Sequence, residues 1–192
     1  MPNKYKETTK DILLCLFTAG AIMVAATSPF FLINIAREIK RNRKYIRKEV
    51  RKKLDERKIA KDLERLKRNR LIILSEKDGK FKLELTKKGK RIVEEIQLED
   101  MKIEKPISWD KKWRVVIFDI PDKKRRARDA LREKLQEMKF YPLQKSVWVH
   151  PYPCEKEIQF LCEFFEITPY VNIIAADNIY DDIKLRKYFN LL

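Results

Sequence analysis

The sequence contains few of the residues from which phosphate loops and metal sites are built. Its only glycines are Gly20, Gly79 and Gly89, and none stands in a P-loop or dinucleotide-binding pattern. Its three cysteines and single histidine lack the spacing of metal ligands, and a tetrahedral zinc site needs four. We therefore expect three free thiols, as in a reducing cytosol, and no zinc site.

Acidic residues are also scarce relative to basic ones, and the imbalance is local. The chain has 45 Lys and Arg against 29 Asp and Glu, which leaves a net charge of +16. Residues 37–70 alone hold 17 basic and 6 acidic side chains, a net charge of +11. Self-repulsion of this size destabilises a compact state unless a polyanion is the normal partner. Nucleic acid and an anionic membrane surface are the two candidates.

Residues 12–36 form a run without one charged side chain. The run meets the length needed to cross a bilayer, roughly 20 apolar residues. Pro29 removes a helical hydrogen bond and disfavours helix at Ser28, so the run divides there. It predicts a long apolar first helix that is buried or forms a dimer, with a membrane anchor as the alternative.

Two helices are predicted in the basic segment. Apolar residues recur at spacings of four and seven over residues 39–54, and Asp55 is the predicted N-cap of a helix over 56–70. In that helix Ile59, Leu63 and Leu66 share one face. The other faces carry Arg57, Lys58, Lys61, Arg65 and Arg68. Such a helix can dock on a core and still face a DNA groove, although a charge run can also be a merely solvated face.

A hairpin and a last helix follow. A short apolar run over 71–74 precedes Asp78-Gly79, a strong signal for a hairpin turn, and residues 81–85 then alternate as a strand. Thr86 can cap the helix that comes next. The order of helix, helix, basic helix, hairpin and helix is that of a winged helix-turn-helix. Lys77 and Lys80 flank its turn as further phosphate contacts, while Arg57, Lys58 and Lys61 lie where groove entry is expected.

A second domain is predicted after a linker. Residues 98–108 lose the periodicity and contain Pro106. Beyond them come a buried strand over 113–118, an amphipathic helix, one or two strands over 141–150, a helix over 154–165 and a strand over 170–175. This βαββαβ succession predicts a ferredoxin-like fold. The chain is thus expected to be α+β, with a winged helix-turn-helix at 1–97, a linker at 98–108 and a ferredoxin-like domain at 109–192.

The stretch VIFDIPDKKRRARDALREKLQEMKFYPLQKSVWVHPY resembles the core of the small CRISPR-associated endonuclease subunit of the spacer-integration complex. The same module is the central domain of PaaX-like transcriptional repressors, where a winged helix precedes it as here. The resemblance implies a DNA-binding regulator, most simply a repressor, that acts as a homodimer on double-stranded DNA. It also implies a cytoplasmic, nucleoid-associated protein with no required cofactor; a membrane-anchored protein is the minority alternative.

The same resemblance raises an enzymatic alternative. In the nuclease family, the Asp that ends the first strand of each of two subunits holds a divalent metal at the dimer interface, and Asp119 matches that position. Carboxylate oxygens suit Mg²⁺, which can polarise a phosphodiester and activate water. An Asp at such a junction also often serves as a turn residue. A metal-dependent endonuclease, or a component of CRISPR adaptation, is therefore the alternative to the regulator.

Overall fold

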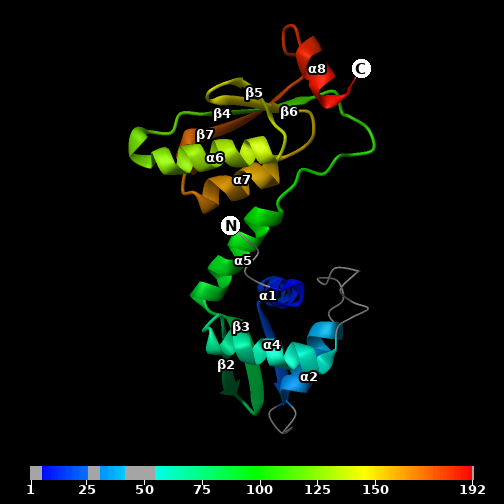
Figure 1. Cartoon of the computed structure of the whole chain (residues 1–192), viewed down its shortest axis with the longest axis vertical. Coiled ribbons are helices and arrows are strands. Elements are labelled where there is room, and N and C mark those ends of the chain that lie inside the picture. Colours follow the sequence, from blue (N-terminus) through cyan, green and yellow to red (C-terminus); the bar gives the residue numbers. More distant parts are fainter. Residues whose placement is uncertain (1–5, 26–30, 42–54, 192) are drawn as a thin grey trace. The chain divides into compact units, whose positions relative to one another are not determined.

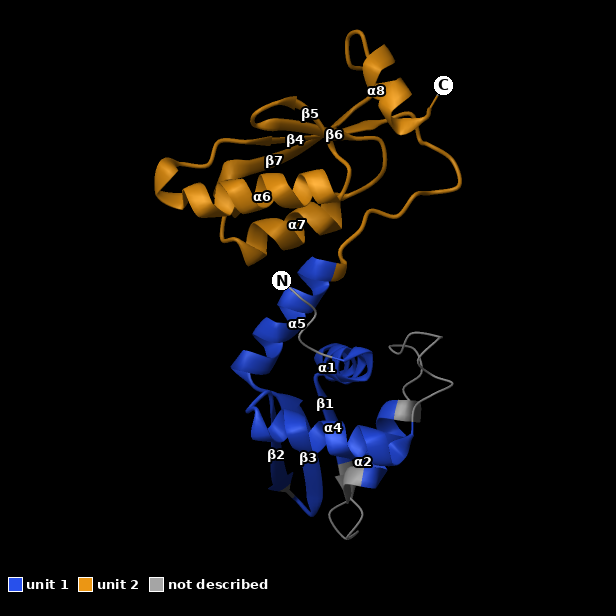
Figure 2. Ribbon diagram, in the orientation of Figure 1, with its two compact units in different colours: residues 1–99 blue, residues 100–192 orange. Residues whose placement is uncertain are grey.

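A computed structural model describes residues 6–25, 31–41 and 55–191 of the chain (Figure 1). The chain divides into two units, Met1–Glu99 and Asp100–Leu192 (Figure 2). Each unit combines helices with one antiparallel sheet. Each unit has a core of buried apolar side chains from its own segment of the chain.

Unit 1 has helices on a three-stranded sheet in the order β1-β3-β2. Its elements are α1 (Glu7–Ala19), β1 (Ala21–Ala25), α2 (Phe31–Arg41), α4 (Glu56–Arg68), β2 (Ile72–Lys77), β3 (Lys80–Leu85) and α5 (Lys87–Asp100). The core gathers apolar side chains from α1, α2, α4, α5 and all three strands. Most of the predicted periodicity over 39–54 falls outside the described residues; Ile39 itself is buried in α2.

The predicted long apolar first helix is wrong. Helix α1 ends at Ala19, because Gly20 takes a φ of 72°, which favours glycine. The chain then enters β1, which pairs with β3 from Ala21↔Glu84 to Ala25↔Lys80. The run is apolar because α1 and Ile22 of β1 contribute to the core. No helix in the described ranges is long and apolar enough to span a membrane, and the predicted break at residues 28–29 lies outside them.

The predicted hairpin is confirmed. Strands β2 and β3 are joined through Asp78 (φ 52°) and Gly79 (φ 67°), and positive φ at both positions is what a type I′ turn requires. Strand β2 begins at Ile72 and runs further than the apolar stretch that predicted it. The predicted cap of the next helix is also confirmed, because the Gly89 N–H donates to Thr86 Oγ1 at 3.0 Å.

Unit 2 has a four-stranded sheet in the order β5-β6-β4-β7, and α6 and α7 lie on one of its faces (Figure 1). Its elements are β4 (Trp113–Phe118), α6 (Arg125–Glu137), β5 (Tyr141–Gln144), β6 (Val147–His150), α7 (Glu155–Phe164), β7 (Val171–Ala176) and α8 (Ile183–Phe189). Short 3₁₀ turns, Asp122–Lys124 and Thr168–Tyr170, precede α6 and β7. The predicted βαββαβ succession is confirmed, with two strands over 141–150. Helix α8 was not predicted.

Helix α8 covers one end of the other sheet face. Leu185 of α8 packs with Trp113 and Val149, and the Trp113 Nε1–H donates to Asp182 Oδ2 at 3.2 Å. Further along this face the cover is incomplete. Ile174, which is paired with Val115 across the sheet, keeps 48% of its surface exposed.

Candidate nucleic-acid interface

Helix α4 presents a core face and a charged face, as its sequence predicts. It begins after Asp55, whose Oδ1 accepts a hydrogen bond from the Arg57 N–H at 3.1 Å. Ile59, Leu63 and Leu66 are fully buried in the core of unit 1. Because these three positions recur at helical spacing, the residues between them are left on the outer surface.

Four of the five predicted cations of α4 are exposed. They are Arg57, Lys58, Lys61 and Arg68. Arg65 is only half-buried and has protein partners: its Nη2 donates to Thr9 Oγ1 at 2.6 Å and lies 3.2 Å from Asp62 Oδ1. Asp62 is buried and accepts a hydrogen bond from Thr8 Oγ1 at 2.9 Å. Arg65 therefore helps to fasten α4 to α1, a contact between residues 56 positions apart that helical spacing alone does not reveal.

The β2–β3 turn carries the other two predicted cations. Lys80 is exposed at the first position of β3. The side chain of Lys77 lies outside the described part of the structure.

More cations lie at the other end of the hairpin, where sequence analysis placed no site. There the end of α4 meets the start of α5, and Lys88 Nζ donates to the Asn69 carbonyl at 3.2 Å. The motif at residues 85–90 could have pointed to this place, because its lysines surround the glycine that makes the close approach possible.

Asp119 is exposed at the end of β4, and its backbone N–H donates to the Tyr170 carbonyl at 2.9 Å. Nearby Asp122 pairs instead with Arg128, at 2.9 Å from Nη2. Over the described residues, no three His, Cys, Asp or Glu side chains are grouped so that they could hold a metal ion. One copy of the chain therefore does not supply a magnesium ligand set in its described part.

Two titratable side chains of unit 2, His150 and Arg114, are buried among neighbouring protein side chains. Burial lowers the pKa of His150 to about 4, and its ring packs 4.9 Å from that of Phe140. Arg114 is buried and donates from Nη2 to Asp110 Oδ2 at 2.6 Å, and this hydrogen bond lowers the pKa of Asp110. His150 is thus neutral at physiological pH and enclosed, which does not suit a general base.

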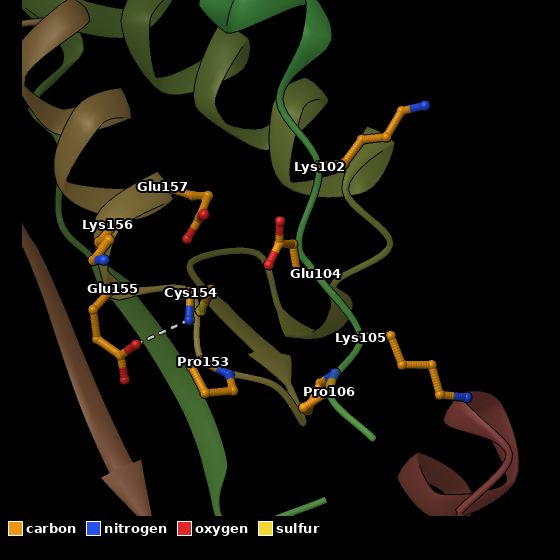
Figure 3. A pocket seen from close by; sticks show the side chains of 9 residues that line it. All are labelled: Lys102, Glu104, Lys105, Pro106, Pro153, Cys154, Glu155, Lys156 and Glu157. Carbon is orange, nitrogen blue, oxygen red and sulfur yellow. Dashed lines mark hydrogen bonds between the residues drawn. The ribbon is translucent and has the colours of Figure 1, made fainter. Parts of the chain in front are cut away.

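A pocket of about 380 Å³ lies between residues 102–106 and the start of α7 (Figure 3). Its lining includes three lysines and three glutamates, so the charges largely cancel. Burial raises the pKa of the Cys154 thiol in its wall to about 12, which keeps the thiol protonated. All three cysteines are free, as expected, and all three are buried. The Cys154 thiol is therefore not an activated nucleophile.

The strand order of unit 2, together with its βαββαβ succession, defines a ferredoxin-like α/β domain. More specifically, residues 106–186 match the family model of the PaaX protein central Cas2-like domain. This match, which covers the central part of unit 2, supports the resemblance to the PaaX-like family drawn from the sequence. No curated protein matches the chain.

Proposed function

We propose that this protein is a DNA-binding transcriptional regulator, a repressor, that acts as a homodimer. Unit 1 is its winged helix and unit 2 its dimerisation domain. The observation that carries the proposal is α4, which buries one face in the core and exposes Arg57, Lys58, Lys61 and Arg68. The match of residues 106–186 to the PaaX central domain supports a role in transcriptional regulation.

The topology of unit 1 supports the winged-helix assignment. Helix α4 leads directly into the β2–β3 hairpin, and β1 pairs with β3 to complete the small sheet. On this basis we assign α4 as the recognition helix and the turn at Asp78-Gly79 as the tip of the wing. Since Lys and Arg contact phosphates more often than bases, the exposed cations provide affinity rather than sequence specificity.

The incompletely covered sheet face of unit 2 supports dimerisation. Val115 and Ile117 are only half-buried there, and Ile174 is 48% exposed. A second copy placed on this face by a twofold axis would bury these side chains in a self-complementary interface. It would also double the number of phosphate contacts and favour a roughly palindromic site.

Binding of the full chain to a labelled duplex over a range of salt concentrations tests the proposal. The variant Arg57→Ala/Lys61→Ala should lose about tenfold or more in affinity. Its log–log salt slope should fall by about 4, because two phosphate contacts are removed from each subunit of the homodimer. Lys184→Ala/Lys187→Ala, which removes the same charge from exposed positions of α8, should bind within about twofold of the wild type. If the wild type fails to bind any duplex at low salt, the proposed function is wrong.

A metal-dependent nuclease is the second candidate, because Asp119 is exposed at the end of the first strand of a Cas2-like domain. Its carboxylate would need a counterpart from a second copy, since one chain holds no ligand set in its described part. Wild type and Asp119→Ala are compared on DNA and RNA with Mg²⁺. Metal-dependent cleavage that is lost on substitution would replace the regulator with an endonuclease.

A further inference from the structure

Two basic segments far apart in sequence meet at the base of the hairpin, at the end away from the turn. Thr86 Oγ1 donates to the Arg70 carbonyl at 2.8 Å, and Lys88 Nζ donates to the Asn69 carbonyl at 3.2 Å. The approach depends on Gly89, because a Cβ at that position would lie 2.0 Å from the Leu71 carbonyl oxygen. Residues 67–70 and 86–90 are therefore held side by side.

These segments carry six exposed cations, which we call the basal patch: Lys67, Arg68, Arg70, Lys87, Lys88 and Lys90. Neither segment contains an acidic residue. None of the six forms an ion pair with any other residue in the described ranges. Like charges at this density repel one another, which destabilises the isolated domain.

Arg70 follows the C-cap of α4 with a φ of 57°, a conformation that glycine or asparagine adopts at lower cost. Lys139 after α6 and Glu166 after α7 adopt the same conformation, so it belongs to the way these helices end. What distinguishes Arg70 is its side chain, which is exposed among the other cations of the patch.

We infer that the basal patch binds phosphates of the DNA backbone and extends the interface beyond α4 and the wing. The inference rests on the proposed function of unit 1. Arg68 belongs both to the exposed face of α4 and to the patch, so the two surfaces are continuous. Duplex DNA fits better than a lipid surface, because neither segment has an exposed apolar side chain to enter a bilayer.

The variant Arg70→Gly separates binding from stability. Glycine relieves the backbone cost at this φ, so the thermal midpoint of unit 1 should equal or exceed that of the wild type. Duplex affinity should nevertheless fall about three- to tenfold near 150 mM salt, and the salt slope should decrease by about 2, because each subunit of the proposed homodimer loses one contact. An unchanged slope in a fully folded Arg70→Gly protein would overturn the inference.

The variant Lys87→Gln/Lys90→Gln tests the other half of the patch, with Lys184→Gln/Lys187→Gln on α8 as the control of equal charge. We expect the salt slope to decrease by about 4 in the first pair only, because two contacts are lost from each subunit of the proposed homodimer. If both basal variants keep the wild-type salt slope while Arg57→Ala/Lys61→Ala lowers it, the basal patch does not bind DNA. The proposed function then still stands. If the wild type binds no duplex, both fail. If the basal variants keep full duplex binding but lose binding to vesicles of anionic phospholipid, the patch contacts membranes instead.

Discussion

Replacement of Gly89 by alanine distinguishes two opposite expectations for stability. Gly89 lies in the first turn of α5, and helix propensity alone predicts that alanine stabilises the unit by about 1 kcal/mol. The structure predicts a loss, because the new Cβ would lie 2.0 Å from the Leu71 carbonyl oxygen and 3.2 Å from Leu85 Cδ2.

The size of that loss depends on the Leu71 carbonyl, which must move to make room for the new Cβ. The Leu71 carbonyl accepts hydrogen bonds from the Thr86 N–H at 3.0 Å and from Thr86 Oγ1 at 3.2 Å. Two lost hydrogen bonds at about 1 kcal/mol each, with about 2 kcal/mol of overpacking, offset the propensity gain and leave a net loss of about 3 kcal/mol. For a unit of this size the thermal midpoint would fall by roughly 12–24 °C.

Circular dichroism of the full chain, recorded on heating, measures this change. All three tryptophans (109, 113 and 148) lie in unit 2, so tryptophan fluorescence follows that unit separately and its midpoint should stay constant. Gly79→Ala is the control: no heavy atom lies within 4 Å of its Cβ position, and its φ of 67° alone should cost about 1 kcal/mol. A Gly89→Ala protein at least as stable as the wild type would refute the close approach of Gly89 to the Leu71 carbonyl.

Three further predictions concern acid stability, core packing and assembly. Because burial lowers the pKa of His150 from 6.5 to about 4, unit 2 should be most stable above pH 6.5 and lose up to about 3 kcal/mol of unfolding free energy as the pH falls towards 4. In urea titrations at several pH values, His150→Phe should make the unfolding free energy of unit 2 less dependent on pH. An unchanged pH dependence would contradict the role given to His150. Leu63→Ala should cost unit 1 about 2–5 kcal/mol by chemical denaturation, since the side chain is 1% exposed; a loss below 1 kcal/mol would argue against this packing. Ile174→Asp should convert the proposed homodimer to a monomer in light scattering while both units stay folded, and a dimer that persists would contradict the proposed interface.

The elements that sequence predicted best have short-range causes. The turn at Asp78-Gly79 needs two positive φ values, which these residue types tolerate, and the cap at Thr86 needs only a hydroxyl three residues before Gly89. The same holds for α4, where the spacing of Ile59 and Leu63 places both on the buried face. In each case the information lies within a few residues.

The N-terminal run shows where this reasoning fails. The absence of charge suggested a long apolar helix before the break at Ser28-Pro29. Burial in a core and burial in a bilayer select the same residue types, and apolar content alone does not distinguish a helix from a buried strand. Strand β1 forms because β3, about 60 residues further along the chain, offers its backbone groups from Lys80 to Glu84. Strand pairing depends on a partner distant in sequence, and the composition of the run does not identify that partner.

The sequence by itself determined the +11 segment, the amphipathic character of α4, the tight turn and the βαββαβ succession of unit 2. Charge, helical spacing and turn chemistry can be assigned without knowing which segments meet. The tertiary structure alone decided that Arg65 is held by Thr9 and that Lys88 meets Asn69. Those contacts arise because packing brings distant segments within hydrogen-bonding distance. The first of them distinguishes Arg65, which fastens α4 to α1, from the exposed cations of α4.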